Sequence, residues 1–197
     1  MTVWLAMALY SLSMSISPGP VNLLALSNGL NHGLARSFSY VSGATIGFIT
    51  LFFLTGISVS YVSEVLPNIM IVLGSLGTAF IAYIGWQIAK TSQVSKQKNS
   101  KDASSFIDGA LLQWLNPKAW IASMAGMTAF QIESTESLTV FSGIYFIVCY
   151  LSISAWALLG EKLQGLLNNP KKTRRFNQAM GWSLILIAGY LLIKLFD

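Results

Sequence analysis

Six apolar stretches, separated by short polar segments, constrain the fold of this chain more than any other feature. They run from Val3 to Leu26, Phe38 to Ser60, Asn68 to Ala89, Ile107 to Phe130, Leu138 to Leu159 and Asn177 to Phe196. Each is close to the ~20 residues that a helix needs to cross the hydrocarbon core of a bilayer. The pattern therefore predicts an all-α, polytopic membrane protein with six transmembrane helices.

The composition fits a single membrane domain over residues 1–197. Hydrophobic residues make up 54% of the chain and charged residues 10%, whereas soluble domains have about 25% charged residues. The net charge of +5 comes mainly from basic residues between the apolar stretches. We interpret these residues as topology signals rather than as a nucleic-acid surface. The expected surroundings are a lipid bilayer, with no nucleic-acid partner.

The distribution of charge between the stretches predicts the orientation. The first, third and fifth connecting segments carry basic residues such as Arg36, Lys98 and Arg174, whereas the second and fourth carry Glu and no basic residue. Cytoplasmic loops retain Lys and Arg. We therefore expect the first, third and fifth segments in the cytoplasm and both termini in the periplasm, with the protein in a bacterial inner membrane.

One linker, at residues 91–105, divides the chain into halves of three apolar stretches each. The linker is rich in Ser, Gln and Lys, and the halves cover residues 1–90 and 106–197. Because each half crosses the membrane an odd number of times, two similar halves lie upside down relative to one another. The sequence therefore predicts two inverted three-helix repeats.

A polar motif with proline interrupts the first apolar stretch of each half. The motifs read Ser17-Pro18-Gly19-Pro20-Val21-Asn22 and Asn116-Pro117-Lys118. Proline inside a helix frees backbone carbonyl groups, and within a bilayer these groups must face a cavity or each other. Transporters commonly build substrate sites from such broken helices, although prolines also simply kink packed helices. We expect one shared site that contains Pro18, Gly19, Pro20, Asn22, Asn116, Pro117 and Lys118.

Polar residues at helical spacing outline further lining for such a site. One stripe in the first apolar stretch holds Ser11, Ser15, Pro18 and Asn22, and one in the fifth holds Ser142, Tyr145, Cys149, Ser152 and Trp156. In lipid, a polar stripe indicates a helix face that is turned towards the protein interior. Packing between helices is the alternative explanation for each stripe.

Two charged residues of the fourth stretch are candidates for proton coupling. A lysine inside an apolar run costs about 2.5–3.5 kcal/mol on insertion scales, so Lys118 is expected to bind a substrate carboxylate or to take part in proton coupling. Its alternative is to snorkel towards the cytoplasmic face. Asp108 is the second candidate, but its spacing from Ser105 also fits a capping box.

The sequence gives no sign of catalysis. The apolar stretches contain no histidine and no pair of carboxylates, which hydrolysis or metal binding would need. We therefore expect a protein that is not an enzyme, without a metal site or a cofactor. A structural or accessory membrane protein, and an exporter of another small solute or ion, remain as alternatives.

The two motifs resemble a known family, the LysE/RhtB family of amino-acid exporters. The first half shares with it Ser17-Pro18-Gly19-Pro20, Asn22, Gly33, Arg36, Gly43 and Gly47, and the second half Phe106, Gly109 and Asn116-Pro117-Lys118. The resemblance covers nearly the whole chain. It implies export of amino acids or their derivatives from the cytoplasm in exchange for protons, through the seven motif residues named above.

The charges narrow the expected substrate. A lysine or arginine substrate would need an anionic partner within the membrane for its second positive charge, and the deep part of this sequence has none. We therefore expect neutral amino acids or derivatives. Glycines suited to close helix contact, such as Gly43 and Gly47, permit a homodimer without requiring one.

Overall fold

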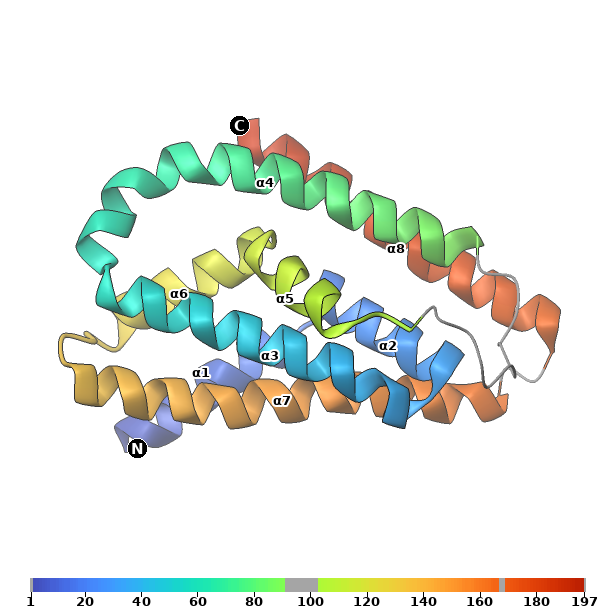
Figure 1. Ribbon diagram of the computed structural model, residues 1–197, viewed down its shortest axis with the longest axis horizontal. Coiled ribbons are helices and arrows are strands. Elements are labelled where there is room, and N and C mark those ends of the chain that lie inside the picture. The colour runs from blue at the N-terminus through green and yellow to red at the C-terminus, as the bar shows by residue number, and fades with distance from the viewer. Residues whose placement is uncertain (1, 91–102, 167–168, 197) are drawn as a thin grey trace.

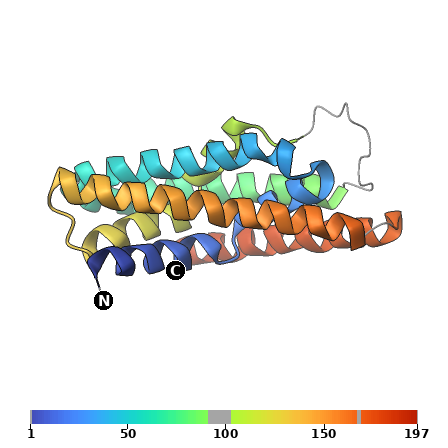
Figure 2. The same cartoon turned by 90° about the horizontal axis from the view of Figure 1, so that it is seen from below.

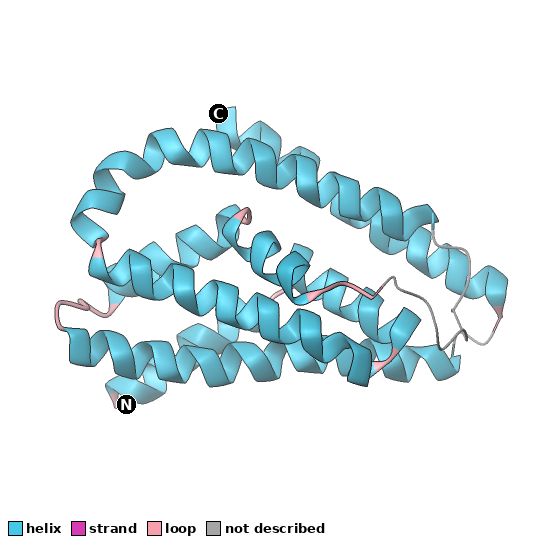
Figure 3. Ribbon diagram, viewed as in Figure 1, coloured by secondary structure: helices cyan, strands magenta, loops and turns pink. Residues whose placement is uncertain are grey.

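The computed structural model describes residues 2–90, 103–166 and 169–196, and in this part of the chain the regular elements are all helices (Figure 3). They are α1 (Val3–Ile16), α2 (Pro20–His32), α3 (Leu34–Ile57), α4 (Val59–Lys90), α5 (Phe106–Trp114), α6 (Pro117–Ala129), α7 (Thr135–Leu166) and α8 (Pro170–Phe196). Most of the predicted linker lies outside the described residues.

Three helical segments of the described chain are long and apolar enough to cross a membrane: Leu34–Ile57, Thr135–Gly165 and Lys171–Ile193. This finding agrees with a membrane protein. Six spans in two inverted repeats stay a prediction. One boundary differs from expectation, because α4 begins at Val59 and runs without a break through the segment that was expected as a loop before Asn68. A helix can continue beyond the apolar core into the polar boundary, where its backbone bonds remain internal.

The first and fourth apolar stretches are each broken into two helices, as the motifs predict. α1 ends at Ile16 and α2 begins at Pro20, with Gly19 in an extended conformation between them. α5 ends at Trp114 and α6 begins at Pro117. Proline suits the first position of a helix because its missing N–H would have no helical partner there and its φ angle is already helical. Each motif therefore ends one helix and starts the next.

Each broken helix packs against the long helix of the other half (Figures 1 and 2). α7 packs along α1 and α2, α3 packs along α5 and α6, and α3 and α7 also contact each other. Glycines on both partners bring the backbones together. A Cβ added to Gly29 on α2 would lie 1.8 Å from the carbonyl oxygen of Ala157 on α7, and one on Gly43 of α3 would lie 1.9 Å from that of Phe106 on α5.

α4 and α8 form a pair along one side of the molecule (Figure 1). They pack mainly against each other and approach most closely at Gly85 and Gly181, where a Cβ on Gly181 would lie 2.3 Å from the carbonyl oxygen of Gly85. Gly77 of α4 also faces the carbonyl oxygen of Leu115, at the second helix break. The pair is thus attached to the other helices near that break.

A cluster of aromatic side chains fills the interior between the end of α3 and the start of α7. Phe52 meets Phe141 edge to face at 5.0 Å between ring centroids, and Phe48 lies 4.6 Å from Tyr145. Tyr10 of α1 also contacts this cluster. Edge-to-face aromatic pairs pack favourably, so this cluster closes the interior on the side that the charge pattern assigns to the periplasm.

Candidate functional site

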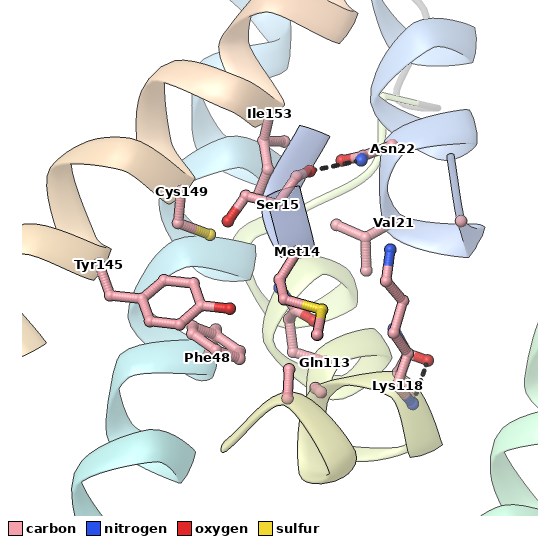
Figure 4. A pocket seen from close by; sticks show the side chains of 14 residues that line it. Met14, Ser15, Val21, Asn22, Phe48, Gln113, Lys118, Tyr145, Cys149 and Ile153 are labelled. Atoms are coloured by element: carbon pink, nitrogen blue, oxygen red, sulfur yellow. Dashed lines mark hydrogen bonds between the residues drawn. The ribbon is translucent and has the colours of Figure 1, made fainter. Parts of the chain in front are cut away.

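The two helix breaks face one pocket inside the molecule (Figure 4). Its lining comes from six helices and consists of Met14, Ser15, Gly19, Val21, Asn22, Phe48, Gln113, Asn116, Lys118, Ala119, Ala122, Tyr145, Cys149 and Ile153. The space open to the centres of water molecules is about 40 Å³, which is enough for roughly three waters. The pocket in this conformation is therefore compact, and none of its described lining residues comes from α4 or α8.

Asn22 holds the first break in place. Its Nδ2 donates hydrogen bonds to the carbonyl oxygens of Ser15 at 2.7 Å and Ser17 at 2.9 Å, which lie near the end of α1. In the described part of the chain no side chain caps the start of α2. The C-terminal carbonyls of a helix attract cations, and its N-terminal amides attract anions. The first break therefore presents partial charges of both signs beside one pocket.

Lys118 connects the second break to the first. At the start of α6 its backbone N–H donates to Oδ1 of Asn116, at 3.1 Å. Its Nζ donates to Oγ of Ser17 at 2.7 Å and to the carbonyl oxygen of Ser17 at 3.1 Å. No carboxylate among the described residues pairs with this ammonium group. The side chain points into the pocket, towards Asn22 and Val21 (Figure 4).

The opposite side of the pocket is largely apolar. Figure 4 shows Tyr145 and Cys149 of α7, together with Phe48 of α3, across the pocket from Asn22 and Lys118. Tyr145, Cys149 and Phe48 are all buried. Pockets that bind small molecules commonly combine apolar walls with a few well-placed polar groups. The lining therefore has a polar end at Asn22 and Lys118 and an apolar end at Phe48.

The structure brings four of the seven predicted site residues to the pocket. Gly19, Asn22, Asn116 and Lys118 line it. Pro20 and Pro117 are buried as the first residues of α2 and α6 and do not line the pocket, and Pro18 is exposed. The prolines thus shape the breaks. Substrate binding by the seven residues stays a prediction.

Asp108 forms the capping box that the sequence allows. Its carboxylate accepts hydrogen bonds from the backbone N–H of Ser105 at 2.7 Å and from its hydroxyl at 2.9 Å, and its own N–H donates to that hydroxyl at 3.2 Å. Asp108 does not line the pocket and forms no bond with Lys118. Its role in proton coupling stays a prediction.

The sequence motifs did not identify Ser17 as the partner of Lys118, nor Phe48 and Gln113 as lining residues. Ser17 was part of the first motif, but its contact spans 101 residues of sequence. Phe48 lies in an apolar stretch with no local signal, whereas the polar side chain of Gln113 inside such a stretch is itself a sign of an interior position. By contrast, Ser15, Tyr145 and Cys149 belong to the two polar stripes, and all three line the pocket.

A second polar cluster lies at the other end of α2. Asn31 donates to the carbonyl oxygen of Ser27 at 2.9 Å and accepts from Nδ2 of Asn177 on α8 at 3.3 Å. Glu161 of α7 accepts from the backbone N–H of Leu34. These bonds tie the end of α2 and the start of α3 to α7 and α8. The charge pattern assigns this end to the cytoplasm.

Apolar helices, two of them interrupted, with both breaks at one internal pocket, define the architecture of a membrane translocator. The chain belongs to the LysE type translocator family, whose model matches residues 12–195. It is therefore a multi-pass bacterial membrane protein of a family of amino-acid exporters.

Relatives in Escherichia coli and Shigella flexneri are similar over nearly their whole length. Proteins named cysteine/O-acetylserine efflux protein, from Escherichia coli strain K12, Escherichia coli O6:K15:H31 and Shigella flexneri, are each 27% identical to this chain over 191 residues. Each match covers 95% of this chain and 94% of the relative. No solved structure matches the chain significantly.

Proposed function

We propose that this protein exports neutral amino acids or their small derivatives from the cytoplasm, in exchange for protons that enter the cell. The observation that carries the proposal is the contact of Lys118 with Ser17, which joins the two helix breaks at one pocket. The family and the names of the relatives support an amino-acid substrate. The substrate contacts are assigned to the two motifs, with Gly19, Asn22 and Asn116 beside Lys118.

The charges around the pocket favour a zwitterion. The start of α2, next to Gly19, offers backbone amides to a carboxylate, and the end of α1 offers the oxygens of Ser17 to an ammonium group. Among the described lining residues, Lys118 carries the one positive charge and no side chain carries a carboxylate. A second positive charge on a lysine substrate would therefore find no carboxylate among the described lining residues to compensate it.

The apolar wall favours a small substrate side chain. Phe48, Tyr145 and Ile153 are buried and packed, so they bound the space beyond the charged end of the pocket. Side chains of the size found in cysteine or O-acetylserine, the molecules in the relatives' names, suit such a space. Aromatic amino acids would require these three side chains to move.

Efflux from reconstituted vesicles tests the proposed function. Vesicles that contain the purified protein are preloaded with radiolabelled cysteine, O-acetylserine, threonine, leucine or lysine, and efflux is followed with and without a proton gradient. We expect efflux of small neutral amino acids that a gradient of the correct sign accelerates, and background efflux of lysine. Efflux of lysine alone would contradict neutral selectivity, and no efflux above protein-free vesicles would contradict the whole proposal.

A further inference from the structure

We infer that Ser17 is the subsite for the ammonium group of the substrate, and that the ammonium group of Lys118 competes with it for the same two oxygens. The inference rests on the proposed function and deepens it, because a single contact at Ser17 would explain both substrate recognition and proton exchange. In this mechanism Nζ of Lys118 occupies the ammonium subsite when no substrate is bound, and it does not bind the substrate carboxylate.

The hydrogen bonds at Ser17 suit an ammonium group. The hydroxyl of Ser17 donates its own hydrogen to the carbonyl oxygen of Met14 at 3.1 Å, so its lone pairs are available as acceptors. Lys118 Nζ, which has donors only, uses both Oγ and the carbonyl oxygen of Ser17. An amino-acid ammonium group has the same three donors, so it fits the same acceptors.

The surroundings of Ser17 also place the second charged group of an amino acid. The start of α2 lies next in the chain, and in the described part of the structure no side chain caps it. A substrate with its ammonium group at Ser17 can therefore direct its carboxylate to the free amides of Val21 and Asn22. Lys118 has no carboxylate, so it uses the oxygens of Ser17 but not the amides at the start of α2.

Competition between the two ammonium groups couples substrate to proton. A like charge nearby disfavours the charged form of a titratable group, and the effect is strong in a poorly hydrated interior. The substrate carries its own carboxylate as compensation, whereas Lys118 has no paired carboxylate among the described residues. When the substrate binds, Nζ of Lys118 therefore gives its proton to water. When the substrate leaves, Nζ takes up a proton and returns to Ser17.

The other titratable groups near Lys118 are neutral or already hydrogen-bonded, so Lys118 is the group that exchanges the proton. The neutral side chains of this kind on the helices around the pocket include Tyr10, Tyr40, Tyr145, Cys149 and Tyr150, and the hydroxyl of Tyr150 contacts that of Ser42. The hydroxyls of Tyr10 and Tyr40 donate to the backbone oxygens of Ala122 and Val21. Asp108, the charged residue of α5, is engaged by Ser105. One proton is thus exchanged for one substrate.

Two transport assays on the same vesicles separate substrate recognition from proton coupling. Counterflow measures uptake of radiolabelled cysteine into vesicles that contain unlabelled cysteine, without a proton gradient. Driven accumulation measures uptake into vesicles with an acidic lumen, where protons leave as cysteine enters. If the wild-type protein carries no cysteine in either assay, the proposed function fails for this substrate and the inference fails with it.

We expect Lys118→Met to reduce driven accumulation to the level without a gradient, and to lower the ratio of driven accumulation to counterflow at least tenfold. Lys118→Arg, which keeps a donor that cannot lose its charge, should lose both activities at least tenfold while it elutes as a folded protein. Lys90→Met is the matched control, because Lys90 is exposed and lies over the ring of Trp86, and it should leave both assays unchanged.

We expect Ser17→Ala to raise the KM for counterflow at least fivefold, because the substrate loses the hydroxyl. Ser13→Ala is the matched control, since the hydroxyl of Ser13 is exposed and bonds within α1. Loss of counterflow in a folded Lys118→Met protein would overturn the inference, because Lys118 would then hold the substrate itself. Wild-type activity in Lys118→Arg would overturn it as well.

Proton release gives a readout that does not depend on transport. The protein is solubilised in detergent in a weakly buffered solution, and a pH indicator reports the protons released into that solution as ligand is added. We expect cysteamine, which has the ammonium group and no carboxylate, to release protons from wild type and none from Lys118→Met. We expect 3-mercaptopropionate, which has the carboxylate and no ammonium group, to release none from either. The reverse ligand preference would overturn the inference.

Discussion

At the scale of single residues, the site depends on side chains that satisfy the backbone at the two breaks. Asn22 bonds two carbonyl oxygens near the end of α1, and Asn116 caps α6 through the N–H of Lys118. Unpaired backbone groups are expensive in a buried, apolar setting. The side-chain amides of Asn22 and Asn116 therefore stabilise the two breaks, in addition to any contact with substrate.

Replacement of Asn22 by alanine tests whether this side chain stabilises the first break. The variant leaves the carbonyl oxygens of Ser15 and Ser17 without the donor from Asn22, which costs about 1–3 kcal/mol. We expect a lower melting temperature in detergent and at least a tenfold loss of transport. Thr50→Ala is the control, because its exposed hydroxyl bonds within its own helix. A variant with wild-type melting and transport would show that Asn22 does not hold the break.

Asp108 has two candidate roles, which are to cap α5 and to transfer protons. Its oxygens are occupied by Ser105, so we expect Asp108→Asn, which keeps an acceptor oxygen, to retain driven accumulation. Asp108→Ala should lower stability by about 1 kcal/mol, typical of a lost cap, measured by thermal unfolding. Counterflow that persists in Asp108→Asn while driven accumulation is lost would instead make Asp108 a proton carrier.

At the scale of helices, the sequence predicted both breaks because proline, glycine and asparagine act locally. Pro20 and Pro117 determine where α2 and α6 begin. The contact of Lys118 with Ser17 could not be predicted, because it depends on how helices distant in sequence are packed. Phe48 was equally hidden, since an apolar residue in an apolar stretch does not reveal whether it faces lipid or a pocket.

The glycines that join α2 to α7 set a limit on what the interface tolerates. A Cβ at Gly29 would lie 1.8 Å from the carbonyl oxygen of Ala157, whereas one at Gly143, an exposed position of α7 away from this contact, meets nothing within 4 Å. We expect Gly29→Ala to destabilise the protein by about 1–3 kcal/mol or more. Gly143→Ala should be neutral or slightly stabilising. Equal melting temperatures of the two variants would contradict this helix packing.

At the scale of the whole molecule, the pocket lies between two closed ends. The aromatic cluster around Phe52 and Phe141 fills one end, and the polar cluster around Asn31 and Asn177 ties helices together at the other. A path along the helices from the pocket to either end of the molecule passes one of these clusters.

The orientation of the molecule is a prediction that reporter fusions can check. Basic residues between the apolar stretches place the first, third and fifth segments in the cytoplasm. We expect alkaline phosphatase, which is active only in the periplasm, to be active when fused after Asp197 and inactive when fused within residues 91–102. A fluorescent protein that matures only in the cytoplasm should give the opposite result. Reversed signals at both positions would invert the proposed orientation.

The α4–α8 pair lies beside the helices that form the pocket, and none of the described lining residues belongs to it. The pair meets the helices that form the pocket where Gly77 faces Leu115, beside the second break. A chimaera that takes these two helices from a relative with another cargo should keep the selectivity of its host. The pair is then free to diverge, as long as the glycine crossing at Gly85 and Gly181 is preserved.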